Sequence, residues 1–186
     1  MRAMLRHADA SRDAAACAAI YAPFVRDTAV SLEEVPPDAA EMAARIAQIE
    51  AAHPWLVLED EGQVVGFAYA SQHRVRAAYR WAADVTVYIE PSRHRRGAGR
   101  RLYGALMDAL RAQGLRMACA GITLPNGASV GLHESMGFVP VGVYRHIGWK
   151  LGEWRDVGWW QLDLGHPGDV APDPPRAPQR LDSAQA

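Results

Sequence analysis

The segment from Val85 to Leu102 constrains the fold of this chain more than any other. It reads V-T-V-Y-I-E-P-S-R-H-R-R-G-A-G-R-R-L: an apolar β-branched run, a basic turn with two glycines, and the start of a Leu- and Ala-rich helix. A strand that leads through a glycine turn into a helix presents unpaired backbone N–H groups and the positive end of the helix dipole. The segment therefore predicts an α/β fold with an anion site suited to a pyrophosphate.

The spacing of Gly97 and Gly99 excludes two common phosphate-binding loops. A Walker loop requires Gly-Lys-Ser/Thr, which is absent, and a dinucleotide fingerprint requires a third glycine where Leu102 stands. The turn instead resembles the pattern Gln/Arg-x-x-Gly-x-Gly/Ala of the GNAT superfamily of N-acetyltransferases, with His94 in place of the usual Gln or Arg. The resemblance implies that the turn binds the pyrophosphate of acetyl-CoA (acetyl-coenzyme A). The alternative is a basic helix start on a solvated face.

The composition indicates one enzyme domain. The 186 residues can bury a single core, and the net charge of −1 argues against nucleic acid as the main partner. Cys17 and Cys119 lie far apart, and the seven histidines show no ligand spacing with acidic residues, so we expect no metal. The N-terminus does not resemble a signal peptide and no apolar run reaches ~18 residues. We therefore expect a cytoplasmic protein without a membrane partner.

Apolar periodicity and turn residues predict alternating strands and helices. Ser11 is the expected cap of the first helix. Beyond Gly165 the chain is rich in Pro, Asp and Ala without periodicity, which predicts a domain at 1–164 and a disordered tail at 165–186. The expected elements are strands at Met1–Arg6, Trp55–Glu59, Gln63–Ala70, Val85–Ile89, Met117–Leu124, Val139–Ile147 and Trp154–Asp163, and helices at Ser11–Val25, Pro36–Ala51, Arg100–Gln113 and Ser129–Met136.

A second motif supports the same superfamily. The segment N126-G-A-S-V-G-L-H-E-S-M-G-F138 resembles Asn-x-x-Ala-x-x-x-Tyr-x-x-x-Gly-Phe, with Ser129 and His133 replacing the usual Ala and Tyr. Together with P54-W-L-V57, R76-A-A-Y-R-W81 and W154-R-D-V-G-W-W-Q-L-D163, it resembles the phosphinothricin and methionine sulfone/sulfoximine N-acetyltransferases up to about Leu164. The resemblance implies the GNAT fold: a mixed, mostly antiparallel central sheet flanked by helices, with splayed central strands that bind acetyl-CoA.

Two residues are candidates for proton transfer in this chemistry. An amine must lose its ammonium proton before it attacks, and the departing thiolate must be neutralised. Asp84 stands where the resembling family has a Glu as its proposed general base; Asp is one methylene shorter, so we expect a bridging water. His133 stands where the superfamily's thiolate-protonating Tyr usually stands, and imidazole can serve as an acid or a base near neutral pH. Asp84 could instead order the preceding loop, and His133 could be a satisfied polar residue.

The resemblance also implies the cofactor contacts. Val87, Tyr88 and Ile89 are expected to offer backbone groups to the acetyl and pantetheine amides, which requires a strand that splays from its neighbour. Asn126 is expected to hydrogen-bond the pantetheine arm, a role compatible with capping the following helix. The other expected cofactor-binding residues are Arg95, Arg96, Gly97, Ala98, Gly99, Arg100 and Ser135.

The loop before the core strand is the expected acceptor site. Arg74 and Arg76 can bind a carboxylate or phosphinate in a bidentate way, and Tyr79 follows them in the loop. Leu32 stands in the first long loop, where the family commonly has an aromatic residue, and completes the expected substrate-binding set. The alternative is a solvated basic loop. Three further histidines are expected at the surface or at the substrate rim: His73, His94 and His146.

These residues predict an enzyme that transfers acetyl directly to the α-amine of a small amino-acid analogue, such as phosphinothricin, methionine sulfone or methionine sulfoximine. The alternatives are a polyamine, an aminoglycoside or a protein amine as acceptor, or a non-catalytic acyl-CoA sensor. The two loop arginines argue against cationic acceptors. The Trp-rich segment from Gly148 to Trp160 is interpreted either as a homodimer interface or as core, and the resemblance favours a homodimer.

Overall fold

The computed structural model describes residues 3–93, 97–165, 168 and 172–179. Within them, seven strands form one sheet in the order β1-β2-β3-β4-β5-β7-β6. Neighbouring strands are antiparallel except β4 and β5, which are parallel, so the expected mixed, mostly antiparallel sheet is confirmed. The strands are β1 (Met4–His7), β2 (Trp55–Asp60), β3 (Gln63–Gln72), β4 (Ala82–Ile89), β5 (Met117–Leu124), β6 (Val139–Lys150) and β7 (Glu153–Asp163).

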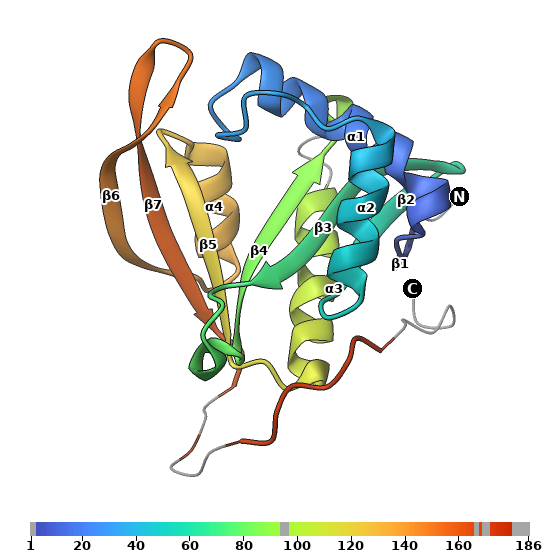
Figure 1. Ribbon diagram of the computed structural model, residues 1–186, viewed down its shortest axis with the longest axis vertical. Helices are drawn as coiled ribbons and strands as arrows, with labels where there is room; N and C mark the ends of the chain where they lie inside the picture. The colour runs from blue at the N-terminus through green and yellow to red at the C-terminus, as the bar shows by residue number, and fades with distance from the viewer. Residues whose placement is uncertain (1–2, 94–96, 166–167, 169–171, 180–186) are drawn as a thin grey trace.

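Helices cover both faces of this sheet (Figure 1). The helices α1 (Ala10–Asp27) and α2 (Ala39–Glu50) lie together on one face. The helices α3 (Ala98–Gln113) and α4 (Gly127–Ser135) lie on the other, where Tyr103 of α3 contacts His133 of α4. None of the described helices is long and apolar enough to cross a membrane.

Period-two alternation along the strands divides the core into two clusters. In β2, Trp55 packs with α1 and α2, whereas the next residue, Leu56, packs with α3. In β4, Val85 belongs to the α3 cluster and Tyr88 packs against the α1–α2 cluster. The side chain of Asp84 alternates with that of Val85, so it projects toward the α1–α2 face.

The helix caps differ from the expected ones. The carboxylate of Asp9, not Ser11, caps α1: it accepts hydrogen bonds from the backbone N–H of Ser11 at 2.9 Å and of Arg12 at 3.1 Å. A carboxylate cap of this kind contributes about 1 kcal/mol. In the same way, α2 begins at Ala39 after Asp38 rather than at the preceding prolines, because Asp38 accepts from the third backbone N–H after it.

The central strands β4 and β5 separate partway along their length. They pair from Ala82 to Asp84 on β4 and from Met117 to Cys119 on β5. Beyond this point β4 continues its register with β3, and β5 continues with β7. A gap therefore opens between the parallel strands, as the splayed-strand prediction requires.

Part of the expected tail contacts the domain. The backbone N–H of Arg176 donates to the Gln113 carbonyl at 2.8 Å, and the Gln113 side chain donates back to the Arg176 carbonyl at 2.8 Å. The indole N–H of Trp81 donates to the Asp173 carbonyl at 3.0 Å. Residues 172–179 thus contact the domain without forming a helix or strand, and the domain boundary at Leu164 and the disordered tail stay predictions.

Candidate active site

A cavity of about 620 Å³ lies where β4 leaves β5. Eight of the expected cofactor-binding residues line it: Val87, Tyr88, Ile89, Gly97, Ala98, Gly99, Arg100 and Asn126. Ser135 is not among its described lining residues, but its hydroxyl accepts a hydrogen bond from Arg100 at 3.4 Å. Arg95, Arg96 and the neighbouring His94 lie outside the described residues.

The glycine turn at one end of this cavity has the geometry of an anion cradle. Gly97, the N-cap of α3, has φ +78°, a conformation that L side chains rarely adopt. A Cβ built on Gly97 would meet no atom within 4 Å, which leaves open space before the helix. The first N–H groups of α3 have no carbonyl within the helix and can bind a phosphate. The volume and the donors fit the pyrophosphate and pantetheine arm of acetyl-CoA.

Asn126 is positioned for both of its expected roles, capping the following helix and contacting the pantetheine arm. Its side-chain oxygen accepts from the backbone N–H of Ser129 at 3.1 Å and caps α4. The same residue lines both the 620 Å³ cavity and a smaller one of about 80 Å³ between β4 and β5. Asn126 can therefore cap α4 and lie beside the candidate pantetheine site at the same time.

Asp84 is the last residue of β4 that pairs with β5, and its side chain contacts His73. Nδ1 of His73 lies 2.6 Å from Oδ1 of Asp84, with side chains 17% and 30% exposed respectively. Burial raises the pKa of Asp84, and the hydrogen bond from His73 acts in the opposite direction. The His73 side chain is partly exposed and paired with the candidate base, and its expected place at the surface or the substrate rim stays a prediction.

Cys119 lies beside the same pair. It is the Cα partner of Asp84 on β5, and its thiol belongs to a cluster with His73 and Asp84. Burial, together with the Asp84 charge, raises the pKa of the Cys119 thiol to about 11. The thiol is therefore protonated at neutral pH and is no nucleophile there.

His133 is held by hydrogen bonds on both ring nitrogens. Nδ1 lies 2.7 Å from the Ser129 carbonyl, so Nδ1 carries the proton, and Nε2 lies 2.9 Å from the Tyr103 hydroxyl, which donates to it. Burial lowers the pKa of His133, opposed by the hydrogen bond to Ser129. The neutral ring lines the 80 Å³ cavity together with Val87 and Tyr88. This geometry favours a positioning role over direct proton transfer.

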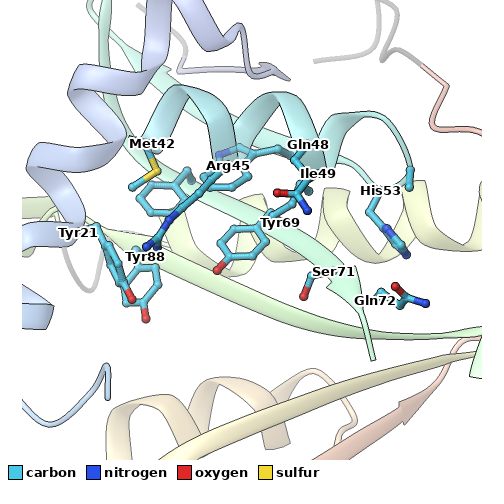
Figure 2. Close-up of a pocket in the computed structure, with 13 residues that line it drawn as sticks. Tyr21, Met42, Arg45, Gln48, Ile49, His53, Tyr69, Ser71, Gln72 and Tyr88 are labelled. Carbon is cyan, nitrogen blue, oxygen red and sulfur yellow. The ribbon is translucent and has the colours of Figure 1, made fainter. Parts of the chain in front are cut away.

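A second cavity, of about 380 Å³, lies between α2 and β3 (Figure 2). Figure 2 shows the hydroxyl groups of Tyr21, Tyr69 and Tyr88 pointing away from α2. The Tyr21 hydroxyl donates to Glu33 at 2.8 Å, and Arg45 binds the same carboxylate with two hydrogen bonds of 2.8 and 2.9 Å. The sequence analysis did not identify this cavity, because its polar residues come from separate elements without a shared motif.

The expected acceptor residues lie outside both larger cavities. Arg74, Arg76 and Tyr79 are exposed in the loop between β3 and β4, and Leu32 is 37% exposed. Arg74 donates to the His73 carbonyl at 2.8 Å, and Tyr79 contacts the His73 ring edge-on at 5.9 Å. The loop therefore adjoins the His73–Asp84 pair, and its role in binding an acceptor stays a prediction.

The comparisons with known proteins agree with this site. Residues 7–159 match the acetyltransferase (GNAT) domain family. The phosphinothricin N-acetyltransferase of Streptomyces viridochromogenes is 38% identical over 92% of this chain and 91% of its own length. The L-methionine sulfoximine/L-methionine sulfone acetyltransferase of Salmonella typhimurium is 34% identical over 91% and 98%.

The solved structures give the same result. The crystal structure of a phosphinothricin acetyltransferase from Sinorhizobium meliloti in complex with acetyl-CoA superposes with a TM-score of 0.86. It is 36% identical and covers 92% of this chain and 94% of its own. With the splayed strands and the glycine turn in place, the chain belongs to the GNAT acetyltransferase family and is an N-acetyltransferase.

Proposed function

We propose that this protein transfers acetyl from acetyl-CoA directly to the α-amine of a small amino-acid-like substrate of the phosphinothricin, methionine sulfone or methionine sulfoximine type. One observation carries the proposal: Asp84 lies at the strand position where β4 and β5 separate, and the cofactor-sized cavity begins beyond it. The relatives named above for phosphinothricin and methionine sulfoximine/sulfone support this acceptor class.

In this proposal, residues along β4 and at the start of α3 have separate roles. The N–H groups at the start of α3 bind the pyrophosphate, and Val87 and Ile89 align the pantetheine amides along the strand. Acetyl-CoA supplies an acetyl thioester. Asp84 accepts the ammonium proton directly or through water, and His73 stabilises the carboxylate in its charged form.

In this proposal His133 positions α4, whose residues line the cavity across from β4. Its ring proton is bound to the Ser129 carbonyl, and it accepts from Tyr103, so the imidazole has no spare proton for the thiolate. It fixes the first turn of α4, where Asn126 faces the cavity. His133 thus positions α4 in this proposal, in place of the proton-transfer role that the sequence analysis expected.

Arg76, with Arg74 beside it, is proposed to bind the acceptor's carboxylate or phosphinate. Both are exposed cations in the loop that adjoins His73. Bidentate guanidinium binding would hold a small zwitterion with its amine toward Asp84. Cationic acceptors would be repelled by the same loop.

The experiment is thiol release from acetyl-CoA against a panel of amines. Phosphinothricin, methionine sulfone and methionine sulfoximine should be turned over, and spermidine, an aminoglycoside and a peptide should not. Arg76→Ala should raise the KM for the zwitterions, while Arg80→Ala should not, because Arg80 donates within its own loop to the Ala77 carbonyl. Turnover of polyamines alone would move the protein to another acceptor class. Cofactor binding without any turnover would favour the acyl-CoA sensor.

We also infer a cytoplasmic homodimer that needs no metal for acetyl transfer. β6 is an edge strand of the sheet and exposes an apolar row that includes Val141, Val143 and Trp149 at 62%, 42% and 54%. An exposed apolar edge of this kind is a pairing surface. Light scattering should give twice the chain mass, and Trp149→Glu should give a monomer. The two free cysteines, Cys17 and Cys119, are compatible with a reducing compartment.

A further inference from the structure

Three side chains with metal-binding chemistry meet beside the proposed base. A ring nitrogen of His73, a carboxylate oxygen of Asp84 and the sulfur of Cys119 all lie within 4.8 Å of one another. Asp84 and Cys119 are register partners on β4 and β5, and His73 directly follows β3, the other neighbour of β4. Because register partners project to the same face, the sheet itself holds the carboxylate and the thiol together.

The donor set suits zinc. Zinc binds imidazole nitrogen, carboxylate oxygen and thiolate sulfur, with bonds of about 2.0–2.3 Å. Two ligands on one tetrahedral zinc therefore stand roughly 3.5 Å apart. The 2.6 Å contact between His73 and Asp84 would open by about 1 Å, and Cys119 would approach by at most about 1.3 Å. Side-chain rotation supplies shifts of this size.

The site is partly exposed to solvent and offers three of the four ligands that zinc takes. All three residues are half-buried, so an ion can enter from solvent. Three protein ligands with an open fourth position occupied by water are an arrangement that zinc adopts in proteins. Binding would release the thiol proton of Cys119 to solvent, and His73 would bind the ion through Nδ1 as a neutral imidazole with its ring proton on Nε2.

We propose that His73, Asp84 and Cys119 form a zinc site whose occupancy inhibits acetyl transfer. The inhibition rests on the proposed function, because a carboxylate bound to zinc no longer accepts the proton of the amine. The binding itself does not depend on that function. The sequence analysis expected no metal, because the three ligands come from two strands and the loop after a third, and they share no spacing motif.

The binding test uses cobalt(II) as the probe on the metal-free full chain. Cobalt should give a thiolate-to-metal charge-transfer absorption at one equivalent, and zinc should remove it. Cys119→Ser and Cys119→Ala should lose the absorption, although both retain Cys17, which is fully buried on α1. No absorption in the wild-type chain, or the same absorption in the two variants, would overturn the proposal. Coenzyme A is left out, because its own thiol binds metal.

The activity test follows the acetylated product at buffered zinc concentrations. Without metal, Cys119→Ser should equal the wild type. The zinc concentration for half-inhibition should be at least about tenfold higher in Cys119→Ser, and a chelator should restore the wild-type rate. Equal inhibition of both proteins would refute the site. A cobalt absorption without turnover of any amine would refute the proposed function but not the metal site. Normal turnover without the absorption would refute the metal site but not the proposed function.

Discussion

The pairing of His73 with Asp84 gives a prediction for His73→Ala. A hydrogen bond to a charged group contributes about 1.5–3 kcal/mol. The Asp84 side chain is 30% exposed, so we take the lower end, about 1.5 kcal/mol, which corresponds to about tenfold in rate. The value of kcat/KM for the preferred acceptor should therefore fall about tenfold in mildly acidic solution.

The pH dependence decides whether this fall comes from Asp84. Burial raises the pKa of Asp84, whereas His73 and the charge of Arg74 lower it. Removing His73 leaves burial opposed by Arg74 alone, so the pKa rises further. A smaller fraction of the carboxylate is then ionised at acidic pH, and the loss should shrink as the pH increases. The assay is a profile of kcat/KM against pH for the wild type, His73→Ala and His73→Asn, whose amide can still donate to Asp84. An equal loss at every pH, or no loss, would refute the coupling.

Three further substitutions test other parts of the site. Asp84→Asn should lower kcat by about 10²–10⁴-fold with acetyl-CoA binding retained by calorimetry, whereas the nearby Glu90→Gln should change kcat little; similar losses in both would contradict the assignment of the base. Gly97→Ala should raise the KM for acetyl-CoA and lower stability by about 1–2 kcal/mol, because its φ of +78° is unfavourable for alanine; an unchanged KM would count against the anion cradle. Tyr103→Phe should lower the free energy of unfolding in urea by about 1–3 kcal/mol, because Nε2 of buried His133 loses its donor, and an unaltered midpoint would show that this hydrogen bond contributes nothing.

Local signals in the sequence were sufficient for most of the fold. The β-branched run ending at Ile89 and the glycine turn before α3 identified the central strand and the cofactor helix, because each signal lies within one element. The cap of α1 was misplaced by two residues, since Ser11 and Asp9 are both good capping residues and only the backbone geometry distinguishes them. Such errors shift the ends of elements without changing the order of the strands.

The chemistry of the site could be predicted only where a motif carries it. The motif identified the position of His133 and contains Ser129, the partner of Nδ1, but the hydrogen bond to Nε2 comes from Tyr103, thirty residues earlier. His73 has no motif, and its partner Asp84 is eleven residues away on the next strand, so only the sheet brings the two side chains together. Cys119 joins them through the last paired position of the parallel strands. The position of the proposed base, Asp84, is therefore set by the strand register at the point where β4 and β5 separate. Any change that moves this point should alter proton transfer before it alters cofactor binding.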